Sequence, residues 1–145
     1  MRTLIIAVAI TLWVPALAGA DIREIKKDLV RIARENKIRP ADLLAIADVE
    51  SNFRPGGTGD KKDGRFRSWG MFQIQTKLHS VSKKHALDYR WAAGWACWYL
   101  ILRGYRKDRR RGIRRYNGGG KRGSRGWRMS WAYLAKVEKA AEKYE

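Results

Sequence analysis

The sequence has few of the residues that support disulfide or metal chemistry. It contains one cysteine, Cys97, and two histidines, His79 and His85, among 145 residues. A single cysteine cannot form an intrachain disulfide, which excludes a disulfide-stapled scaffold. The histidines lie far from any cluster of Cys, Asp or Glu, so we expect no metal site. The sequence also has no internal repeat and no glycine-rich phosphate loop, and we expect no cofactor.

Acidic residues are also scarce. The chain has 14 Asp and Glu against 32 Lys and Arg, which gives a formal net charge of +18. A surface of this charge favours a polyanionic partner. Nucleic acid, anionic cell-wall polymer, phospholipid headgroups and lipopolysaccharide all meet that description, and charge alone does not choose among them. The length is sufficient for one domain with a hydrophobic core.

The one long hydrophobic run lies at the N-terminus. Arg2 precedes an apolar run over residues 4–17, and Ala-Gly-Ala at 18–20 has the small-x-small form of a signal-peptidase site. The run is shorter than the ~20 residues that span a bilayer, so we favour a signal peptide over a membrane anchor. We predict cleavage after residue 20 and export of residues 21–145 to the periplasm or the medium.

The exported part is predicted to be mainly helical. Apolar residues recur at helical spacing from Asp21, a suitable N-cap, to about residue 36. A second helix begins at Pro40, which fits a first helical turn, and ends near Ser51. Residues 86–102 are apolar on nearly all faces, which is typical of a buried central helix, with Asp88 as its cap.

The segments outside these helices are predicted to have less regular structure, apart from one last helix. Residues 54–67 form a charged, glycine-rich loop, and 68–75 fit either a short extended segment or one helical turn. Residues 106–128 are a basic stretch rich in glycine and arginine. We expect Ser130 to cap a last helix whose apolar stripe is Trp131, Leu134, Val137, Ala140 and Ala141. Cys97 is expected to be a small buried hydrophobe rather than a reactive thiol.

One carboxylate breaks the amphipathic pattern of the second helix. At ~100° per residue, Glu50 falls in the same sector as Leu43 and Ile46, whereas Asp48 points elsewhere. A carboxyl that faces apolar groups has a raised pKa and can act as a general acid near neutral pH. The alternative is a helix-end glutamate that turns back to solvent.

Four short motifs follow one another along the exported part. They are Glu50-Ser51-x-Phe53, Ser68-Trp69-Gly70-Met71-Phe72-Gln73-Ile74, Tyr116-Asn117-Gly118-Gly119 and Tyr133-Leu134-x-Lys136-Val137. Each is weak alone, but in this order they resemble the lytic transglycosylases of the soluble-transglycosylase, lysozyme-like family over nearly all of 21–145. The resemblance favours the functional interpretation of Glu50 and implies a single lysozyme-like α+β domain, mainly α.

The resemblance implies an activity on peptidoglycan. Members of the family cleave the β-1,4 bond between N-acetylmuramic acid and N-acetylglucosamine without water and leave 1,6-anhydro ends. Glu50 matches the single catalytic glutamate, first the general acid to the glycosidic oxygen and then the base toward the C6 hydroxyl. The residues that match substrate-binding positions are Ser68, Gly70, Met71, Gln73, Tyr116, Asn117 and Tyr133.

The resemblance also implies roles for these residues. Ser68 would hydrogen-bond the glutamate or the sugar, Gly70 would allow close approach to the glycan, and Gln73 would face it. Met71 replaces a usual leucine and is expected to pack in the wall. Tyr116 and Asn117 would line the cleft, unless Asn117 only serves a glycine-rich turn. Tyr133 would lie near the glutamate, unless it is an interior aromatic.

Two other functions fit the residues. A hydrolytic lysozyme needs a second carboxylate. Asp60 and Asp63, in the loop before Ser68, are the candidates for it. A non-enzymatic polyanion binder would use the basic residues 106–128. For the enzyme, this basic segment would contact anionic wall or membrane surfaces, and we expect no specific nucleic acid.

Relatives of this size often accompany secretion, conjugation or phage assemblies, so the resemblance implies such a partner. Arg115 departs from the alanine usual before Tyr-Asn.

Overall fold

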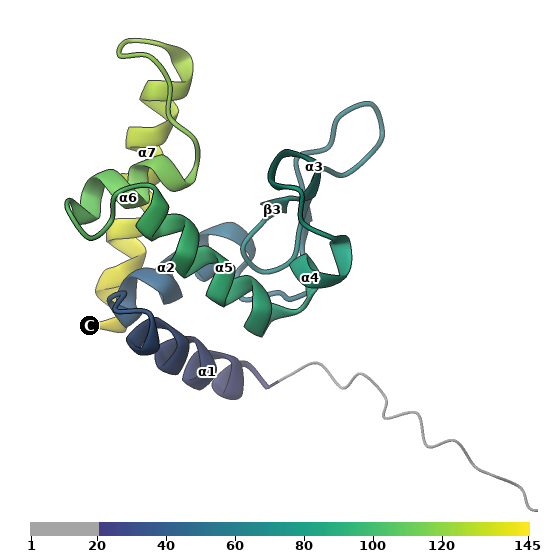
Figure 1. Ribbon diagram of the computed structural model, residues 1–145, viewed down its shortest axis with the longest axis vertical. Helices are drawn as coiled ribbons and strands as arrows, with labels where there is room; N and C mark the ends of the chain where they lie inside the picture. The colour runs from purple at the N-terminus through teal and green to yellow at the C-terminus, as the bar shows by residue number, and fades with distance from the viewer. Residues whose placement is uncertain (1–20) are drawn as a thin grey trace, which may run out of the picture.

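The computed structural model describes residues 21–145 (Figure 1). The predicted signal peptide, residues 1–20, lies outside the described residues. The chain is mainly helical, as predicted. Its elements in order are α1 (Ile22–Glu35), α2 (Pro40–Ser51), β1 (Thr58–Gly59), β2 (Ser68–Trp69), β3 (Ile74–Gln75), α3 (Thr76–His79), α4 (Lys83–Leu87), α5 (Tyr89–Leu102), α6 (Arg109–Tyr116), α7 (Arg125–Ala141) and the 3-10 turn η1 (Glu142–Tyr144). No helix within 21–145 is both long and apolar enough to cross a bilayer.

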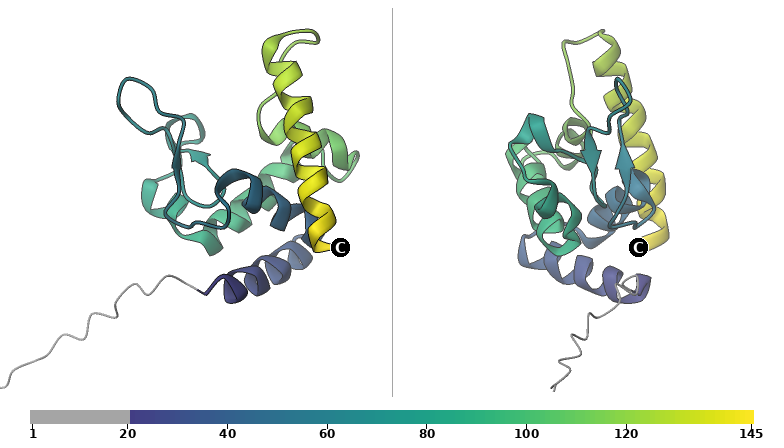
Figure 2. Two further views of the ribbon diagram at one scale, coloured as in Figure 1. Left: turned by 180° about the vertical axis from the view of Figure 1, so that it is seen from behind. Right: turned by 90° about the vertical axis from the view of Figure 1, so that its right-hand side faces the viewer.

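The core is built around α2. This helix packs against α1 on one side and α7 on another, and it also contacts α5. Every residue from 41 to 47 is buried. In Figure 2, α7 rises on one side of α2 and α5, and the sheet with its long loop rises on the other. The end of α2 therefore lies between the sheet and α7.

Local signals explain where the first two helices begin and end. The Asp21 side chain accepts the backbone N–H of Arg23 at 3.0 Å and caps α1, as predicted. Pro40 occupies the first turn of α2, where its missing N–H costs nothing. Asn52 and Phe53 follow in the left-handed region, at φ 53° and 58°. These two residues turn the chain sharply away after Glu50 and bury the Phe53 ring.

The buried central helix was predicted only in part. The chain breaks at Asp88, whose carboxylate caps α5 by accepting the backbone N–H groups of Arg90 and Trp91. The prediction that α5 is buried all round is wrong, because Trp98 is 54% exposed and Leu102 is 62% exposed. The buried side carries small residues instead: Ala92, Ala93, Ala96 and Cys97, all fully buried. Small side chains let α5 approach α1 closely, while Trp98 and Leu102 face outward.

The start of the last helix was also predicted wrongly. Helix α7 begins at Arg125, and its cap is Ser124, whose hydroxyl accepts the backbone N–H of Trp127 at 3.2 Å. Ser130 lies buried inside the helix and donates to the Trp127 carbonyl. Trp131 is 40% exposed and does not belong to the buried stripe. The basic stretch is therefore more helical than its composition predicts, because it also contains α6.

The undecided segment 68–75 forms two short strands. Strands β1, β2 and β3 pair in that order, all antiparallel, with Ser68 opposite Gln75 and Trp69 opposite Ile74. Gly70 begins the turn between β2 and β3 at φ +79°, and a Cβ there would collide with the Ala86 carbonyl. Glycine is required here because the turn packs tightly against α4.

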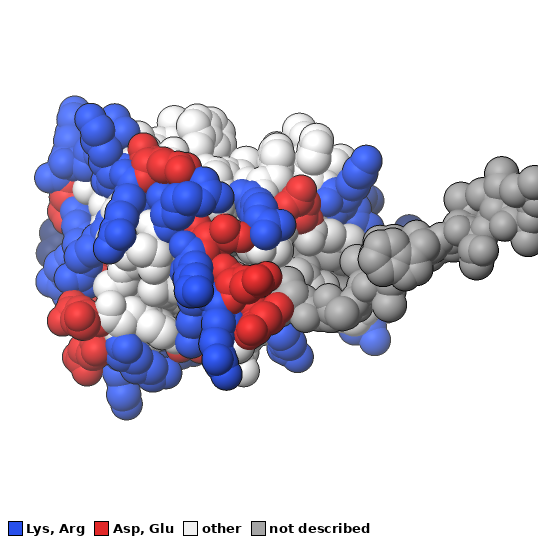
Figure 3. Space-filling view, turned by 90° about the horizontal axis from the view of Figure 1, so that it is seen from below, with Lys and Arg blue, Asp and Glu red and all other residues white. Residues whose placement is uncertain are grey.

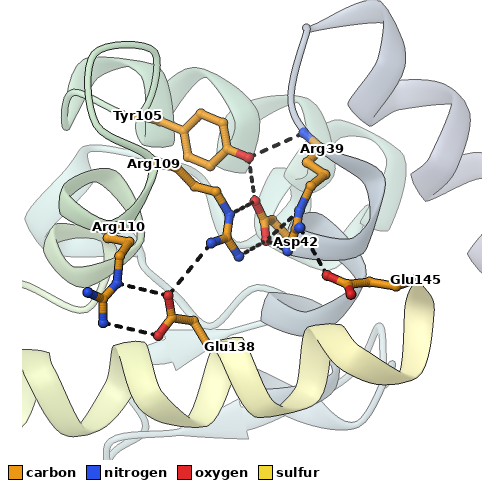
Figure 4. A network of polar contacts seen from close by, with 7 residues as sticks. All are labelled: Arg39, Asp42, Tyr105, Arg109, Arg110, Glu138 and Glu145. Atoms are coloured by element: carbon orange, nitrogen blue, oxygen red, sulfur yellow. Dashed lines mark hydrogen bonds and ion pairs between the residues drawn. The ribbon is translucent and has the colours of Figure 1, made fainter.

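A buried ionic network fixes the opposite end of α2 (Figure 4). Asp42 is fully buried and binds Arg109 through two hydrogen bonds of 2.7 and 2.6 Å. Arg39 and the Tyr105 hydroxyl donate to the same carboxylate. Burial alone would raise the pKa of Asp42, but the hydrogen bonds from Arg109 and Tyr105 outweigh it and hold the pKa below its usual value. Arg109 is thus a structural residue.

Candidate active site

Glu50 lies in the last turn of α2, on the wall of a cleft of about 410 Å³. The walls come from α2, strands β1 and β3 with the turn before β3, α3, α5, and the end of α6 with the segment that follows it. The lining residues are Glu50, Thr58, Gly59, Asp60, Phe72, Gln73, Ile74, Gln75, Leu78, His79, Trp95, Tyr99, Arg103, Tyr116, Asn117 and Gly118. The cleft thus brings together the first three predicted motifs.

The environment of Glu50 makes its carboxyl group titrate near neutrality. Burial raises the pKa of Glu50 to about 7, and the negative charge of Asp60 adds to this effect. The Tyr133 hydroxyl donates a hydrogen bond of 2.7 Å to Glu50 Oε1, which works in the opposite direction because it favours the carboxylate. Such a group can donate a proton and accept one at the same pH.

Asp48 provides a contrast on the same helix. Its carboxylate accepts the Tyr144 hydroxyl at 2.9 Å and pairs with Lys143 at 3.2 Å, both near the C-terminus. It does not line the cleft. The two carboxylates therefore point to different sides of α2, as the helical spacing predicts.

Two tyrosines form the wall behind Glu50. The rings of Tyr116, at the end of α6, and Tyr133, on α7, stack with centroids 6.4 Å apart. The Tyr116 hydroxyl donates to the Phe72 carbonyl at 3.1 Å. Burial, and next the charge of Glu50, raise the pKa of both phenols well above the usual value. Tyr133 consequently remains a neutral donor to Glu50.

The turn between β2 and β3 divides its predicted residues between cleft and core. Gln73 lines the cleft, and its amide donates to the Gly70 carbonyl at 2.9 Å. Met71 is fully buried and lies in the core rather than on the cleft wall. Gly70 faces Ala86 instead of the cleft. Asn117 lines the cleft and is exposed.

Ser68 contacts a different carboxylate from the one expected. It is fully buried, and its hydroxyl donates to Asp60, not to Glu50. Gln75 Nε2 also donates to the same oxygen of Asp60, at 3.2 Å. Asp60 lines the cleft with Glu50, whereas Asp63 does not. Two neighbours thus hold a second carboxylate inside the site.

One wall of the cleft was not predicted from the sequence. Trp95 and Tyr99 stack with their centroids 4.9 Å apart, and the His79 ring lies 5.0 Å from each. The guanidinium of Arg103 lies over the Tyr99 ring at 4.7 Å. The i, i+4 spacing of Trp95 and Tyr99 was the available signal, but it also fits a core stripe. Burial, with the charge of Arg103, lowers the pKa of His79.

Within residues 21–145, no three side chains of His, Cys, Asp or Glu gather closely enough to hold a metal ion. Cys97 is buried, and its burial raises the pKa of the thiol to about 12. The polar groups that line the cleft are two carboxylates, side-chain amides, the Thr58 hydroxyl, the His79 imidazole and the Arg103 guanidinium, beside aromatic rings. Comparison of the chain with protein-family models, curated proteins and solved structures finds no significant match.

Proposed function

We propose that the protein is a peptidoglycan lytic transglycosylase with a lysozyme-like fold. The observation that carries the proposal is the carboxyl group of Glu50, with a pKa of about 7 inside an open cleft. Glycosidic bond cleavage needs an acid of raised pKa beside the scissile oxygen. The four motifs support the same assignment.

Glu50 acts twice in the proposed mechanism. Its protonated carboxyl group gives its proton to the glycosidic oxygen, and the bond from that oxygen to C1 of the muramic acid breaks. The resulting carboxylate then takes the proton of the C6 hydroxyl, whose oxygen attacks C1 and closes the 1,6-anhydro ring. Tyr133 holds Oε1 in place through both steps. No water is consumed, and Glu50 ends protonated, ready for another cycle.

The cleft offers fitting contacts for an amino sugar chain. The amide groups of Gln73 and Asn117 can donate to and accept from N-acetyl groups. The Trp95 ring, supported from behind by Tyr99, presents aromatic surface to the apolar faces of pyranose rings. We assign substrate binding to these four side chains and to Tyr116.

Mass spectrometry of the muropeptides released from purified peptidoglycan tests the proposal. We expect products with 1,6-anhydro-muramic acid, one water lighter than hydrolysis products. Glu50→Gln should release them about 10²–10⁴-fold more slowly. Asp63→Asn, which removes an exposed acid outside the cleft, is the matched control and should retain full activity. Absence of glycan products from the unmodified chain would refute the assignment.

A hydrolytic lysozyme is the second candidate, because Asp60 lines the cleft with Glu50. Hydrogen bonds from Ser68 and Gln75 hold this carboxylate in place, and it could activate a water molecule. In that case the products would carry reducing ends, and Asp60→Asn would abolish their release. A transglycosylase should instead keep its anhydro products in Asp60→Asn.

We further propose that export brings the enzyme to the cell wall and that its positive surface retains it there. The proposed partners are glycan strands, anionic wall or membrane material, and a secretion, conjugation or phage assembly as the host complex. Binding of Glu50→Gln to purified sacculi should weaken steeply as salt rises from low to physiological concentration, since exposed charges are screened. An affinity for sacculi that did not change with salt concentration would contradict this role of the charge.

A further inference from the structure

A second hollow, lined largely by cations, lies beside the cleft. It has a volume of about 450 Å³ and forms where α5 ends and α6 begins. We call it the basic groove. Its charged lining residues are Arg103, Arg106, Lys107, Arg111 and Arg115, and Ile101 and Leu102 add apolar surface.

The charge of the basic groove is not neutralised. Within the described part of the chain, no Asp or Glu lines it. The nearest acid in sequence, Asp108, caps α6 by accepting the backbone N–H of Arg111 at 3.0 Å and lines a neighbouring hollow. The charge of Arg111, followed by partial burial and the charges of Arg114 and Arg103, lowers the pKa of Arg115. The guanidinium groups therefore repel one another in the absence of an anion.

Several other arginines of the molecule are paired with acids. Arg109 binds Asp42, and both Arg109 and Arg110 bind Glu138 on α7 (Figure 4). On the face that carries α1, acidic side chains lie among the basic ones (Figure 3), and Arg31 there pairs with Glu35 at 2.8 Å. Unlike these arginines, the cations of the basic groove form no ion pair with an acid among the described residues.

Arg103 connects the basic groove to the cleft. Its side chain lines both hollows. One end of the guanidinium donates to the Tyr99 hydroxyl, while Nε is buried with no hydrogen-bond partner among the described residues. A buried donor without an acceptor is unfavourable and would be satisfied by a bound anion or water. Arg103 therefore lies within reach of a ligand in the cleft and of one in the basic groove.

We propose that the basic groove binds the free carboxylates of the peptide stem on the muramic acid that occupies the cleft. The inference rests on the proposed function. The stem hangs from the lactyl group of that sugar and extends about 3.3–3.6 Å per residue, so it reaches beyond the cleft wall at once. Guanidinium groups bind carboxylates through paired hydrogen bonds. The groove therefore selects peptide-bearing over denuded glycan.

Isothermal titration of the full chain carrying Glu50→Gln tests this inference without turnover. The ligands are two tetrasaccharides of alternating N-acetylglucosamine and N-acetylmuramic acid, one with peptide stems and one with its lactyl groups capped as amides. We expect the stem-bearing ligand to bind about tenfold more tightly, as two or three exposed ion pairs allow. Adding Arg111→Gln and Arg115→Gln should remove this preference and leave the affinity for the capped ligand unchanged.

The matched control removes the same charge elsewhere in the basic stretch. Arg122→Gln with Arg125→Gln alters two exposed residues that line neither hollow, and the tenfold preference should survive. Equal affinity for both ligands before these changes would overturn the stem assignment and leave the proposed function standing. Poly(glycerol phosphate) serves as a competitor. If it bound the groove more tightly and displaced the stem-bearing ligand, the groove would be assigned to a phosphate polymer instead. If neither tetrasaccharide bound, the proposed function itself would be refuted.

Discussion

The two ends of α2 each carry a carboxylate, and their chemistry is opposite. Asp42, at the beginning, is fully buried yet stays ionised, because Arg109, Tyr105 and Arg39 all donate to it. Glu50, at the end, is half-buried and receives one neutral hydrogen bond, and its pKa rises to about 7. Burial alone therefore does not decide protonation. The partners do, and they make one acid structural and leave the other reactive.

The largest expected difference between the two ends is in activity. Glu50→Gln should lower the rate of glycan cleavage by about 10²–10⁴-fold, the range for loss of a general acid or base. Asp42→Asn should lower activity only as far as it unfolds the protein. Release of soluble muropeptides at a temperature where both variants are folded measures this contrast. Comparable losses per folded molecule would contradict it.

The free energy of unfolding should respond in the reverse order, with a larger loss in Asp42→Asn than in Glu50→Gln. Removing one partner of a buried ion pair costs about 3–5 kcal/mol, so Asp42→Asn should lower the free energy of unfolding by that amount. Glu50→Gln should leave it unchanged or raise it, because a partly buried carboxyl group is replaced by a neutral amide. Urea denaturation followed by tryptophan fluorescence gives both values. Glu145→Gln, which removes an exposed partner of Arg39, is the control and should cost below about 1 kcal/mol.

The carboxyl groups at the two ends of α2 should also contribute opposite pH dependences to the stability of the fold. The folded pKa of Glu50 is raised from 4.5 to about 7, so the folded state binds more protons between these values, and stability falls as pH rises through this window. The pKa of Asp42 is lowered, so its contribution is present above the ordinary pKa and is lost as pH falls through the folded value.

Denaturation of the unmodified chain and Glu50→Gln at several pH values checks the first of these slopes. The stability advantage of Glu50→Gln should grow from pH 4.5 to about 7 and then level off. A difference that stayed constant across this window would mean that the pKa of Glu50 is not raised.

A smaller effect should come from Tyr133. Tyr133→Phe removes the hydrogen bond that favours the Glu50 carboxylate, so the pKa of Glu50 should rise further, by up to about one unit. Because Glu50 must be protonated to act as the general acid, the alkaline limb of the pH–rate profile should move upward with it. Tyr116→Phe is the matched control, since that hydroxyl binds the Phe72 carbonyl and its loss should leave the limb in place. Identical shifts in the two variants would exclude a specific role for Tyr133.

The smallest effect should come from Asp60. Its charge raises the pKa of Glu50 less than burial does, so Asp60→Asn should shift the same limb slightly downward. Asp63→Asn serves as the control and should shift nothing. An upward shift in Asp60→Asn would show that the two carboxyl groups do not repel each other in the cleft.

The sequence alone determined the features that depend on neighbouring residues along the chain. Capping by Asp21 and Asp88, the start of α2 at Pro40 and the inward face of Glu50 all follow from contacts within one or two helical turns. The motif resemblance added the expectation that Tyr133 lies near Glu50, and the hydroxyl is 2.7 Å from Oε1.

Only the tertiary structure decided which faces are covered. The exposed Trp98 and the structural role of Arg109 depend on segments far away in sequence, and the contact of Ser68 with Asp60 depends on the pairing of β1 with β2. The aromatic wall of the cleft likewise exists because α3 packs beside α5 and leaves Trp95 open to solvent on one side. Periodicity specifies which residues share a face, but burial and ionisation depend on what is packed against that face.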